Sequence, residues 1–527
     1  MSTLAALRAL HSTIGSALTE IERVYEAQCL DYPALDVPSY QNIPADSPLP
    51  AELKPSEKQI EQERLTTDPA VANAINLAVA AGGQLLATLQ QPLVSVLETS
   101  HLGHITAALS FLEASNVVEI LRGAGPEGLH AQDIARKIEE IRLGKEVASD
   151  SPAEYIEPAK LSHVLRLLAT QHWLREVKPD VFANNRLSSL LDSGKTLDQL
   201  RTTPEKKYDA TNGLPAFVGF STSELFRSVT HLRDWLLPAR PTDSQSKPKP
   251  ETPFHLAYNT EEGYYAWLER PENASRLAQV GSGMAIARAA SGRKSIADTS
   301  VFPWDKLPKD SVVVDVGGGI GSVSVQLAEP HPHLRLVVQD RAQTVAIAPK
   351  MWGDAHKDLF DSGRISFQAQ DFFEPQPPAL QVPGAGAVAH PAAYLVTRVM
   401  HNWPDVDCVK ILVNLRAAAG PDTKLIVHDM ILQPLCAASS AEPSSADKEF
   451  SSSSSSAVTS LQAPLENWGK AVAPGHLADI TMLTLMNARE RTLEELRALT
   501  LAAGWKITDV DRSPPPMPWG YIVAVPV

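Results

Sequence analysis

Apolar runs recur along the second half of the chain and alternate with amphipathic segments. From Ser311 onward, short runs have the composition of strands: VVVDV, LRLVVQD, RISFQAQDFF, AAYLVTRVM, KLIVHDMIL and YIVAVPV. Val312 to Val314 are apolar without interruption, which is typical of a strand buried on both faces of a sheet. Strand-like runs that alternate with helical patterns predict a doubly wound α/β fold with a mostly parallel sheet. In such a sheet, ligands bind at the carboxyl ends of the strands.

The first half of the chain has a mainly helical pattern. Residues 1–100 are helical apart from a proline-rich stretch at 32–55. Residues 101–191 predict an amphipathic helix, ITAALSFLEASNVVEILRGAG, then the helices GLHAQDIARKI and LSHVLRLLATQHWL, and the hairpin REVKPDVFANN with its turn at Pro179-Asp180. This is the winged-helix arrangement, whose third helix reads DNA in transcription factors. Here that helix has little positive charge beyond His163, Arg166 and His172, so we expect it to pack and not to bind nucleic acid.

These patterns divide the chain into three regions. We expect an N-terminal helical region at 1–100, a winged-helix domain with linking helices at 101–292, and an α/β domain at 293–527. A serine-rich insert at 437–472 interrupts the last region, and its composition predicts a disordered surface loop.

One segment has the length of a membrane span. No charged residue lies between Asp68 and Glu98, but the segment contains Asn, Gln, Gly and Pro residues, which are unfavourable in lipid. Asp68 followed by Pro69 is typical of a helix cap and first turn. We therefore expect a buried or subunit-interface helix and no membrane segment.

Composition excludes several classes of protein. The 527 residues are enough for several domains, and the net charge of −14 disfavours nucleic acid as a partner, because phosphate contacts need a basic surface. The cysteines, Cys29, Cys408 and Cys436, form neither a disulfide framework nor a metal-binding spacing. The N-terminal sequence lacks the pattern of a signal peptide, so we expect a reducing, cytoplasmic location.

The glycine-rich segment VVVDVGGGIG, residues 312–321, limits the possible ligands more than any other feature. Asp315, Gly317, Gly319 and Gly321 give the pattern D-x-G-x-G-x-G at the end of a strand. The dinucleotide fingerprint would need glycine at position 322, which is Ser322, and a nucleotide P-loop would need a following lysine. The pattern is that expected of S-adenosylmethionine (SAM) enzymes, in which the backbone closely approaches the ligand.

Acidic and aromatic residues end the next two strands. Asp340 ends LRLVVQD, where a carboxylate can accept both ribose hydroxyls of an adenosine. Asp371 follows another strand and could accept from the adenine amino group, while Phe372 could stack on the ring. Each residue also has an ordinary interpretation, as a solvated strand-end acid or as a turn cap beside core aromatics.

A histidine and two carboxylates follow the later strands. His401 lies just past the fourth strand, Asp429 belongs to the fifth, and Glu490 precedes a helix that starts with the capping box Thr492-x-x-Glu495. Asp429 and Glu490 could each be surface charges. Together with His401 they form a plausible acid–base set, a histidine oriented by carboxylates. No cluster of metal ligands is evident, so we expect no metal.

The segments VVVDVGGGIG, VVQDRAQTV, DFFEP, RVMHNWPD and NARERTLEEL, in this order, closely resemble the plant- and fungal-type small-molecule O-methyltransferases. These are class I SAM enzymes, such as the caffeate and flavonoid methyltransferases. LLATQHWLREVKPDVFANNRLSSLL and TPFHLAYNTEEGYYAWLERPENASRL are similar to the fungal branch, and the resemblance covers about residues 70–527. It implies a winged-helix dimerisation domain, a Rossmann-like methyltransferase domain, a homodimer, and methyl transfer from SAM to a hydroxyl, phenolic in type, of a small secondary metabolite.

The resemblance also implies roles for particular residues. His401 would be the general base with Asp429 and Glu490 beside it, and Arg398 would lie at the cofactor. The acceptor pocket would be apolar and aromatic, with contacts from Val280, Met284, Trp403 and Met482.

The sequence departs from the family pattern near the predicted base. Asn402 stands where Asp is common, Thr397 stands where plant members have Lys, and Asp429 stands where they often have Glu. These changes bear more on which substrate is accepted than on which reaction is catalysed. The alternatives are a SAM-binding winged-helix protein that does not methylate, an NAD(P)-dependent oxidoreductase, and an N- or S-methyltransferase.

Overall fold

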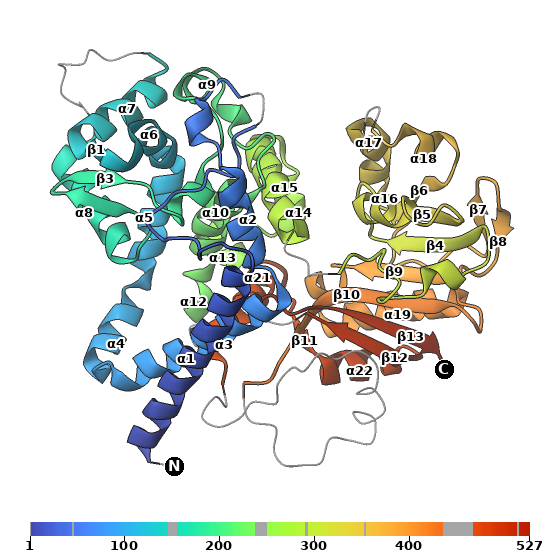
Figure 1. Ribbon diagram of the computed structural model, residues 1–527. Coiled ribbons are helices and arrows are strands. Elements are labelled where there is room, and N and C mark those ends of the chain that lie inside the picture. The colour runs from blue at the N-terminus through green and yellow to red at the C-terminus, as the bar shows by residue number, and fades with distance from the viewer. Residues whose placement is uncertain are drawn as a thin grey trace, which may run out of the picture. The chain divides into compact units, whose positions relative to one another are not determined.

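The computed structural model describes residues 2–44, 47–145, 155–237, 250–289, 294–352, 355–435, 467–513 and 516–527. The chain forms two compact units, Met1–Ala290 and Ser291–Val527. Helices make up most of the first unit, whereas the second is built around one large sheet (Figure 1).

The first unit begins with helices that start at side-chain caps. α1 (Thr3–Ala27) follows Ser2, α2 (Glu57–Leu65) follows a capping box of Ser56 and Gln59, and α3 (Pro69–Leu89) follows Asp68, as predicted. The short helices η1 (Ala51–Leu53) and α4 (Pro92–Ser100) complete this region. α1 packs along α3 through an apolar cluster that includes Ala17, Ile21, Tyr25, Val71 and Ala74.

α3 covers the uncharged stretch of the sequence. Among the helices in the described residues, only α3 has the length and composition of a membrane span, a criterion that core helices of soluble proteins also meet. Val71 and Ala74 are buried, whereas Leu86 and Leu89 are 53% and 63% exposed. One side of α3 is therefore core, and another is apolar and exposed in the single chain.

The next segments form the predicted winged helix, with one difference. α5 (Leu102–Ala114) and α6 (Val117–Ala124) replace the single helix expected up to Gly123, because Asn116 adopts a left-handed conformation (φ 56°) that ends the α-helical path. α7 (Ala131–Leu143) and α8 (Pro158–Thr170) follow. The three-stranded sheet has the order β1-β3-β2, with β1 (Leu129–His130), β2 (Arg175–Lys178) and β3 (Val181–Ala183). Arg166 of α8 forms ion pairs with Glu176 and Asp180 of the hairpin.

Further helices, most of them short, fill the remainder of the first unit. They are η2 (Gly125–Glu127), η3 (Ser188–Leu191), α9 (Leu197–Thr202), η4 (Pro204–Lys206), α10 (Leu214–Phe220), the π-helix η5 (Ser221–Leu225), α11 (Phe226–Val229), α12 (Leu232–Leu236), α13 (Pro253–Tyr258), α14 (Tyr264–Leu268), η6 (Pro271–Asn273) and α15 (Ala274–Ala289). α10 packs against α15.

The second unit contains the predicted doubly wound sheet. Its strands have the order β12-β13-β10-β9-β4-β5-β6. The parallel strands are β4 (Ser311–Val316), β5 (Leu334–Asp340), β6 (Ile365–Ala369), β9 (Ala393–Thr397) and β10 (Lys424–Leu432). β13 (Trp519–Pro526) runs antiparallel between β10 and β12 (Trp505–Arg512), and β11 (Arg491–Thr492) pairs with β10. The strand order reverses between β4 and β9, where such sheets open a ligand crevice.

Helices cover both faces of this sheet (Figure 1). The helices of this unit are η7 (Trp304–Lys306), α16 (Ser322–Ala328), α17 (Ala342–Trp352), α18 (Lys357–Asp361), η8 (Met400–Asn402), α19 (Asp405–Ala418), η9 (Gly469–Ala471), α21 (Ala473–Met486) and α22 (Leu493–Ala502). A separate hairpin joins β7 (Leu380–Val382) and β8 (Gly386–Val388).

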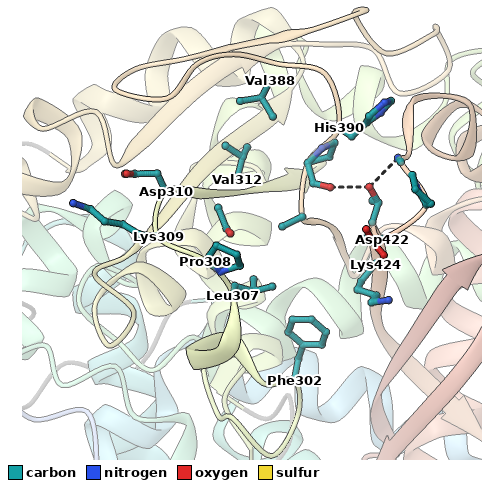
Figure 2. A pocket seen from close by; sticks show the side chains of 16 residues that line it. Phe302, Leu307, Pro308, Lys309, Asp310, Val312, Val388, His390, Asp422 and Lys424 are labelled. Atoms are coloured by element: carbon teal, nitrogen blue, oxygen red, sulfur yellow. Dashed lines mark hydrogen bonds between the residues drawn. The ribbon is translucent and has the colours of Figure 1, made fainter.

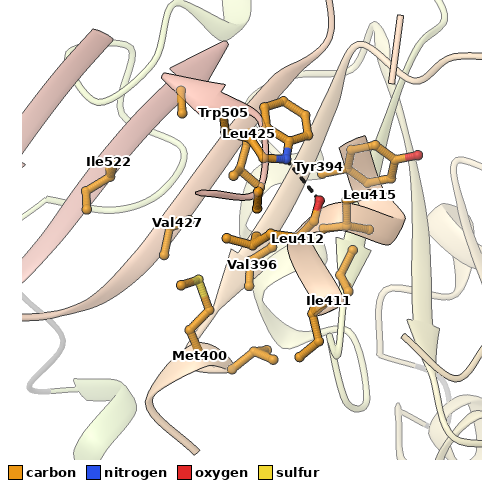
Figure 3. Close-up of a cluster of buried hydrophobic side chains, with 14 of the residues drawn as sticks. Tyr394, Val396, Met400, Ile411, Leu412, Leu415, Leu425, Val427, Trp505 and Ile522 are labelled. Atoms are coloured by element: carbon orange, nitrogen blue, oxygen red, sulfur yellow. Dashed lines mark hydrogen bonds between the residues drawn. The ribbon is translucent and has the colours of Figure 1, made fainter. Parts of the chain in front are cut away.

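Two apolar clusters lie on opposite faces of the sheet. Val312 and Val314 of β4 belong to one cluster and Val313 to the other, which is the alternation of a strand buried on both sides. Figure 3 shows the first cluster, in which Trp505 Nε1 donates to the carbonyl of Leu412 at 3.0 Å. Met400, the residue before His401, is fully buried in this cluster. The turn that carries the predicted base is therefore anchored in the core.

The serine-rich prediction falls mainly outside the described residues. Residues 437–466 lie there, together with Cys436. The end of the predicted insert contains η9 and the buried side chain of Trp468.

Candidate active site

The glycine loop follows β4 and is held against the end of β5. The amides of Gly317 and Gly318 both donate to the carbonyl of Gln339, at 2.8 and 3.2 Å. A Cβ at Gly317 would lie 2.9 Å from Val399, and one at Gly318 would lie 2.6 Å from the Asp315 carboxyl carbon. At Gly319 (φ 60°) a Cβ would meet nothing within 4 Å. The loop is thus packed tightly on one side and open at Gly319, as a cradle for a ligand must be.

The two acids predicted around this loop have different positions. Asp340 Oδ2 accepts from the Gly319 amide at 2.9 Å, so the end of β5 meets the open part of the loop. Asp315 is buried, and its Oδ2 accepts from Ser324 Oγ at 2.7 Å. Burial raises the pKa of Asp315 to about 6 despite the hydrogen bond from Ser324. Asp315 supports the loop from within, and Ser324 is a partner that the sequence did not reveal.

Aromatic residues border the same loop. Phe372 lies 3.6 Å from the Cβ position of Gly317, and its ring meets Trp403 edge-on with centroids 5.8 Å apart. Phe373 meets Trp403 at 4.7 Å. Asp371 Oδ1 accepts from the Phe373 amide at 2.9 Å and so caps the turn that presents these rings. The structure therefore places Trp403, predicted at the acceptor, within an aromatic group beside the glycine loop.

His401 lies in η8, and its ring is fixed by Glu490. Nδ1 of His401 is 2.9 Å from Glu490 Oε1, and the exposed fractions of the two side chains are 14% and 1%. A carboxylate can only accept, so Nδ1 carries the proton and Nε2 of the neutral ring is the free base. Two of the three residues predicted as an acid–base set are in direct contact.

Asp429 contributes charge to this site without a direct bond to the ring. It is buried on β10, and neither of its oxygens has a hydrogen-bond partner among the described residues. Glu490 Oε2 and Trp519 Nε1 are likewise buried and unpartnered in that part of the chain. The Trp519 ring lies 6.4 Å from the His401 ring.

Burial and nearby charges together raise the pKa values of both His401 and Asp429. Burial disfavours the imidazolium of His401, but the Glu490 charge and hydrogen bond, with the Asp429 charge, outweigh it and raise the pKa of His401 to about 9. Burial also raises the pKa of Asp429 to about 7, with the nearby His401 opposing and Glu490 adding to the shift. Perturbed groups of this kind cluster at functional sites.

Arg398 and Asn402 shape the turn before and after His401. Arg398 has a left-handed backbone (φ 54°), and its amide donates to the carbonyl of His428 at 2.8 Å. The Asn402 side-chain amide donates to the Arg398 carbonyl at 3.2 Å. The departure from the family pattern at position 402 thus supplies a bond that holds this turn.

The remaining predicted pocket residues lie on two helices. Met482 is partly buried on α21, which packs beside η8. Val280 is buried and Met284 partly buried on α15 of the first unit. Their contact with the acceptor stays a prediction.

Sequence reasoning missed the arginines next to Glu490 and the acid with which they pair. No side-chain hydrogen bond caps α19, which begins at Asp405. Asp405 instead forms ion pairs with Arg489 and Arg491, since both side chains come from the segment that lies against its turn. Asp479 of α21, also missed, accepts from the Glu490 amide at 2.9 Å. The alternating charges in NARERTLEEL were a signal for such pairing.

A cavity of about 560 Å³ opens at the opposite edge of the sheet (Figure 2). It is lined by the starts of β4, β9 and β10, with Lys309, His390 and Lys424 around it. Ligands of doubly wound sheets bind at the carboxyl ends, so the site described above is the stronger candidate. Within the described residues, no group of three or more His, Cys, Asp or Glu side chains is placed to hold a metal ion.

Comparison with known proteins identifies similar chains. Residues 245–446 match the O-methyltransferase domain. An O-methyltransferase of Armillaria gallica is 32% identical over 508 residues, which cover 96% of this chain and 95% of the relative.

Solved structures share the fold. LepI in complex with SAM has a TM-score of 0.59 at 17% identity, over 89% of this chain and 97% of that chain. The O-methyltransferase NcsB1 from neocarzinostatin biosynthesis, in complex with SAM and 2-hydroxy-5-methyl naphthoic acid, has a TM-score of 0.52 at 18% identity, over 80% of this chain and 96% of that chain. The predicted fold class, a Rossmann-like domain after a helical winged-helix region, is confirmed.

Proposed function

This chain belongs to the fungal branch of the SAM-dependent O-methyltransferases, and from this premise we propose that its acceptor is a phenolic hydroxyl of a small secondary metabolite, with His401 as the general base. The bond between His401 Nδ1 and Glu490, 2.9 Å long, is the observation that carries the base role. It fixes the tautomer in which Nε2 can accept a proton.

The residues at the ends of β4, β5 and β6 fit the methyl donor. Gly319 leaves open space, Asp340 lies at the amide of Gly319, and Phe372 borders Gly317. In this proposal these residues hold the adenosine and the amino-acid end of SAM, with Arg398 near them. When bound, SAM supplies a methyl group made reactive by its positive sulfur.

His401 would remove the phenolic proton as the oxygen attacks. A phenol with a pKa near ~10 is a poor nucleophile at neutral pH, and a positioned base contributes roughly 10²–10⁴ in rate. Because the pKa of His401 is raised to about 9, the His401 ring is neutral in only about one hundredth of the molecules at pH 7. The same carboxylates that hold it protonated stabilise the imidazolium formed in the reaction, so activity should rise with pH.

Aromatic side chains favour an aromatic acceptor. Trp519 lies beside His401, and Phe372, Phe373 and Trp403 form one group next to the glycine loop. Flat rings stack well against such side chains. The ligand of NcsB1, a hydroxylated naphthoic acid, has this chemistry in a protein of the same fold.

A panel of acceptors tests this proposal. The purified protein is incubated with SAM and matched phenols, anilines and thiophenols, and products are measured by mass spectrometry. We expect a mass gain of one CH2 unit on phenols, with anilines and thiophenols at least about tenfold slower. Methylation of anilines or thiophenols alone, or no methylation by protein that binds SAM, would contradict the proposal.

We also propose that the chain forms a homodimer through α3 and α4. Leu86 and Leu89 of α3, and Leu93 and Val96 of α4, are each at least half exposed. Soluble monomers rarely expose apolar groups in such number along adjacent helices. Burial of this surface against a second copy would remove it from water.

A further inference from the structure

One buried guanidinium holds the backbone of the turn that carries His401. Arg491 Nη1 donates to the carbonyl of Met400 at 3.0 Å, and Nη2 donates to the carbonyl of Trp403 at 2.7 Å. These two carbonyls flank His401 in the sequence. The side chain of Arg491 is only 2% exposed, so its bonds are shielded from water.

The charge of Arg491 is balanced from outside the turn. Asp405 Oδ1 accepts from Nε at 2.9 Å and lies 2.8 Å from Nη2, while its own side chain is half exposed. The Cys408 thiol donates to the same two carbonyls, at 3.2 and 3.4 Å. Burial raises the pKa of Cys408 to about 12, which keeps this thiol protonated. The planar fork of arginine reaches the carbonyls of Met400 and Trp403 and the carboxylate of Asp405 at once, and a lysine ammonium does not reproduce this geometry.

Arg491 and the partner of the catalytic ring are neighbours in the chain. Glu490 bonds the ring of His401, and Arg491 bonds the backbone on both sides of it. Two adjacent residues of one segment, Glu490 and Arg491, therefore hold the His401 ring and the backbone around it. Arg491 itself pairs with Ile431 of β10.

We propose that Arg491 is a positioning residue that sets the distance between His401 and Glu490 and so supports the base. This inference rests on the proposed function of His401. Loss of the guanidinium would free the Met400–Trp403 turn and lengthen the bond to Glu490. A longer bond would lower the pKa of His401, and the freed turn would misplace the His401 ring and so slow methyl transfer, while the glycine loop stays unchanged.

The neighbouring Arg489 provides a matched control. It forms an ion pair with the same Asp405 at 2.6 Å and with Glu495 at 2.7 Å, and it is 42% exposed. Its guanidinium bonds end on carboxylates outside the turn that carries His401.

The test compares Arg491→Lys with Arg489→Lys in the full-length protein. The His401 pKa is measured by NMR on protein labelled at histidine Cε1, with the signal assigned by its loss in His401→Ala. The charged groups that act on His401 are Glu490, Asp429 and Arg398, and all remain in both variants. In Arg491→Lys we expect the pKa to fall by at least about half a unit and kcat to fall at least about tenfold, with KM for SAM within twofold. Arg489→Lys should leave all three unchanged.

An unchanged His401 pKa and kcat in Arg491→Lys would overturn the inference. If that variant does not fold, Asp405→Asn gives a second measurement. It removes the negative charge of the half-exposed side chain that pairs with the Arg491 guanidinium. We expect a smaller fall in both quantities, and no change would again overturn the inference. The NMR result does not depend on the role of His401 as base, so a failed base assignment is seen separately as an active His401→Ala enzyme.

Discussion

At the scale of single residues, the pair of His401 and Glu490 determines how the site responds to pH. The pKa of His401 is raised to about 9, chiefly because Glu490 outweighs the effect of burial. The ion pair stabilises the fold fully below the unfolded value of about 6.5 and is lost as pH rises through 9. Catalysis has the opposite dependence, because the base is the neutral form. The enzyme should therefore be most active where this contribution to stability declines.

Replacement of Glu490 by Gln separates charge from hydrogen bonding. The amide oxygen can still accept from His401 Nδ1, but the nearest negative charge is lost. We expect the acidic limb of the kcat/KM profile to move down by roughly one to two pH units, since close charges shift pKa values by about one to three. Asp429→Asn should move it less, because Asp429 makes no hydrogen bond with the described residues. A limb that stays in place in Glu490→Gln would contradict this assignment.

At the scale of elements, the glycine loop joins the end of β4 to α16 and presents one open position. Gly319 and Gly386 have similar left-handed backbones, φ 60° and 76°, and a Cβ at either would meet nothing within 4 Å. Gly386 begins β8, in the hairpin with β7. The two glycines share backbone strain and differ in their place relative to the predicted SAM site.

Alanine at these two positions tests the loop. Each variant should lose about 1–2 kcal/mol of stability, the cost of a left-handed alanine. Only Gly319→Ala should also raise the Kd for SAM, by at least about tenfold, because its methyl group fills the open cradle. Calorimetric titration and thermal unfolding measure the two effects. Equal SAM affinity in both variants would show that SAM does not approach Gly319.

Periodicity predicted the elements better than their ends or partners. The apolar runs predicted β4, β5, β9 and β10, because burial on both faces leaves a direct signature in sequence, and they also predicted β6, of which only Ile365 is buried. The division between α5 and α6 depends on one residue, Asn116, within a continuous apolar pattern. Arg491 and Met400 are 91 positions apart, so no local pattern connects them. Tertiary contacts of this kind follow from the sheet order and not from spacing.

For the candidate site too, the sequence predicted which residues belong to it better than it predicted what each of them contacts. His401 and Glu490 were expected to belong to one acid–base set, although Glu490 was placed before a helix and not at a strand end, and the two side chains are in direct contact. Asp315 has a D-x-G-x-G-x-G position that looks ligand-facing, yet its carboxylate is buried against Ser324. The sequence indicates which side chains reach an edge, whereas packing decides which of them face the crevice.

At the scale of the whole molecule, the exposed apolar helices predict a dimer. Leu93 and Val96 of α4 are 69% and 65% exposed, and Val406 of α19 in the second unit is 74% exposed. Val406 is thus a comparably exposed apolar residue outside α3 and α4.

Light scattering after size exclusion measures the assembly. We expect the wild-type chain at about twice its 57.0 kDa mass, the double variant Leu93→Glu, Val96→Glu as a monomer, and Val406→Glu still as a dimer. A monomeric wild type at micromolar concentration, or a double variant that remains dimeric, would reject this surface as the interface.

The most direct measurement is a single-turnover rate at saturating SAM for His401→Ala beside His390→Ala. His390 is an exposed histidine at the cavity on the opposite edge of the sheet. We predict that His401→Ala slows methyl transfer at least ~10²-fold while the SAM Kd stays within twofold, and that His390→Ala changes neither. A His401→Ala enzyme with wild-type rate, or one that loses SAM affinity as much as rate, would contradict His401 as the general base.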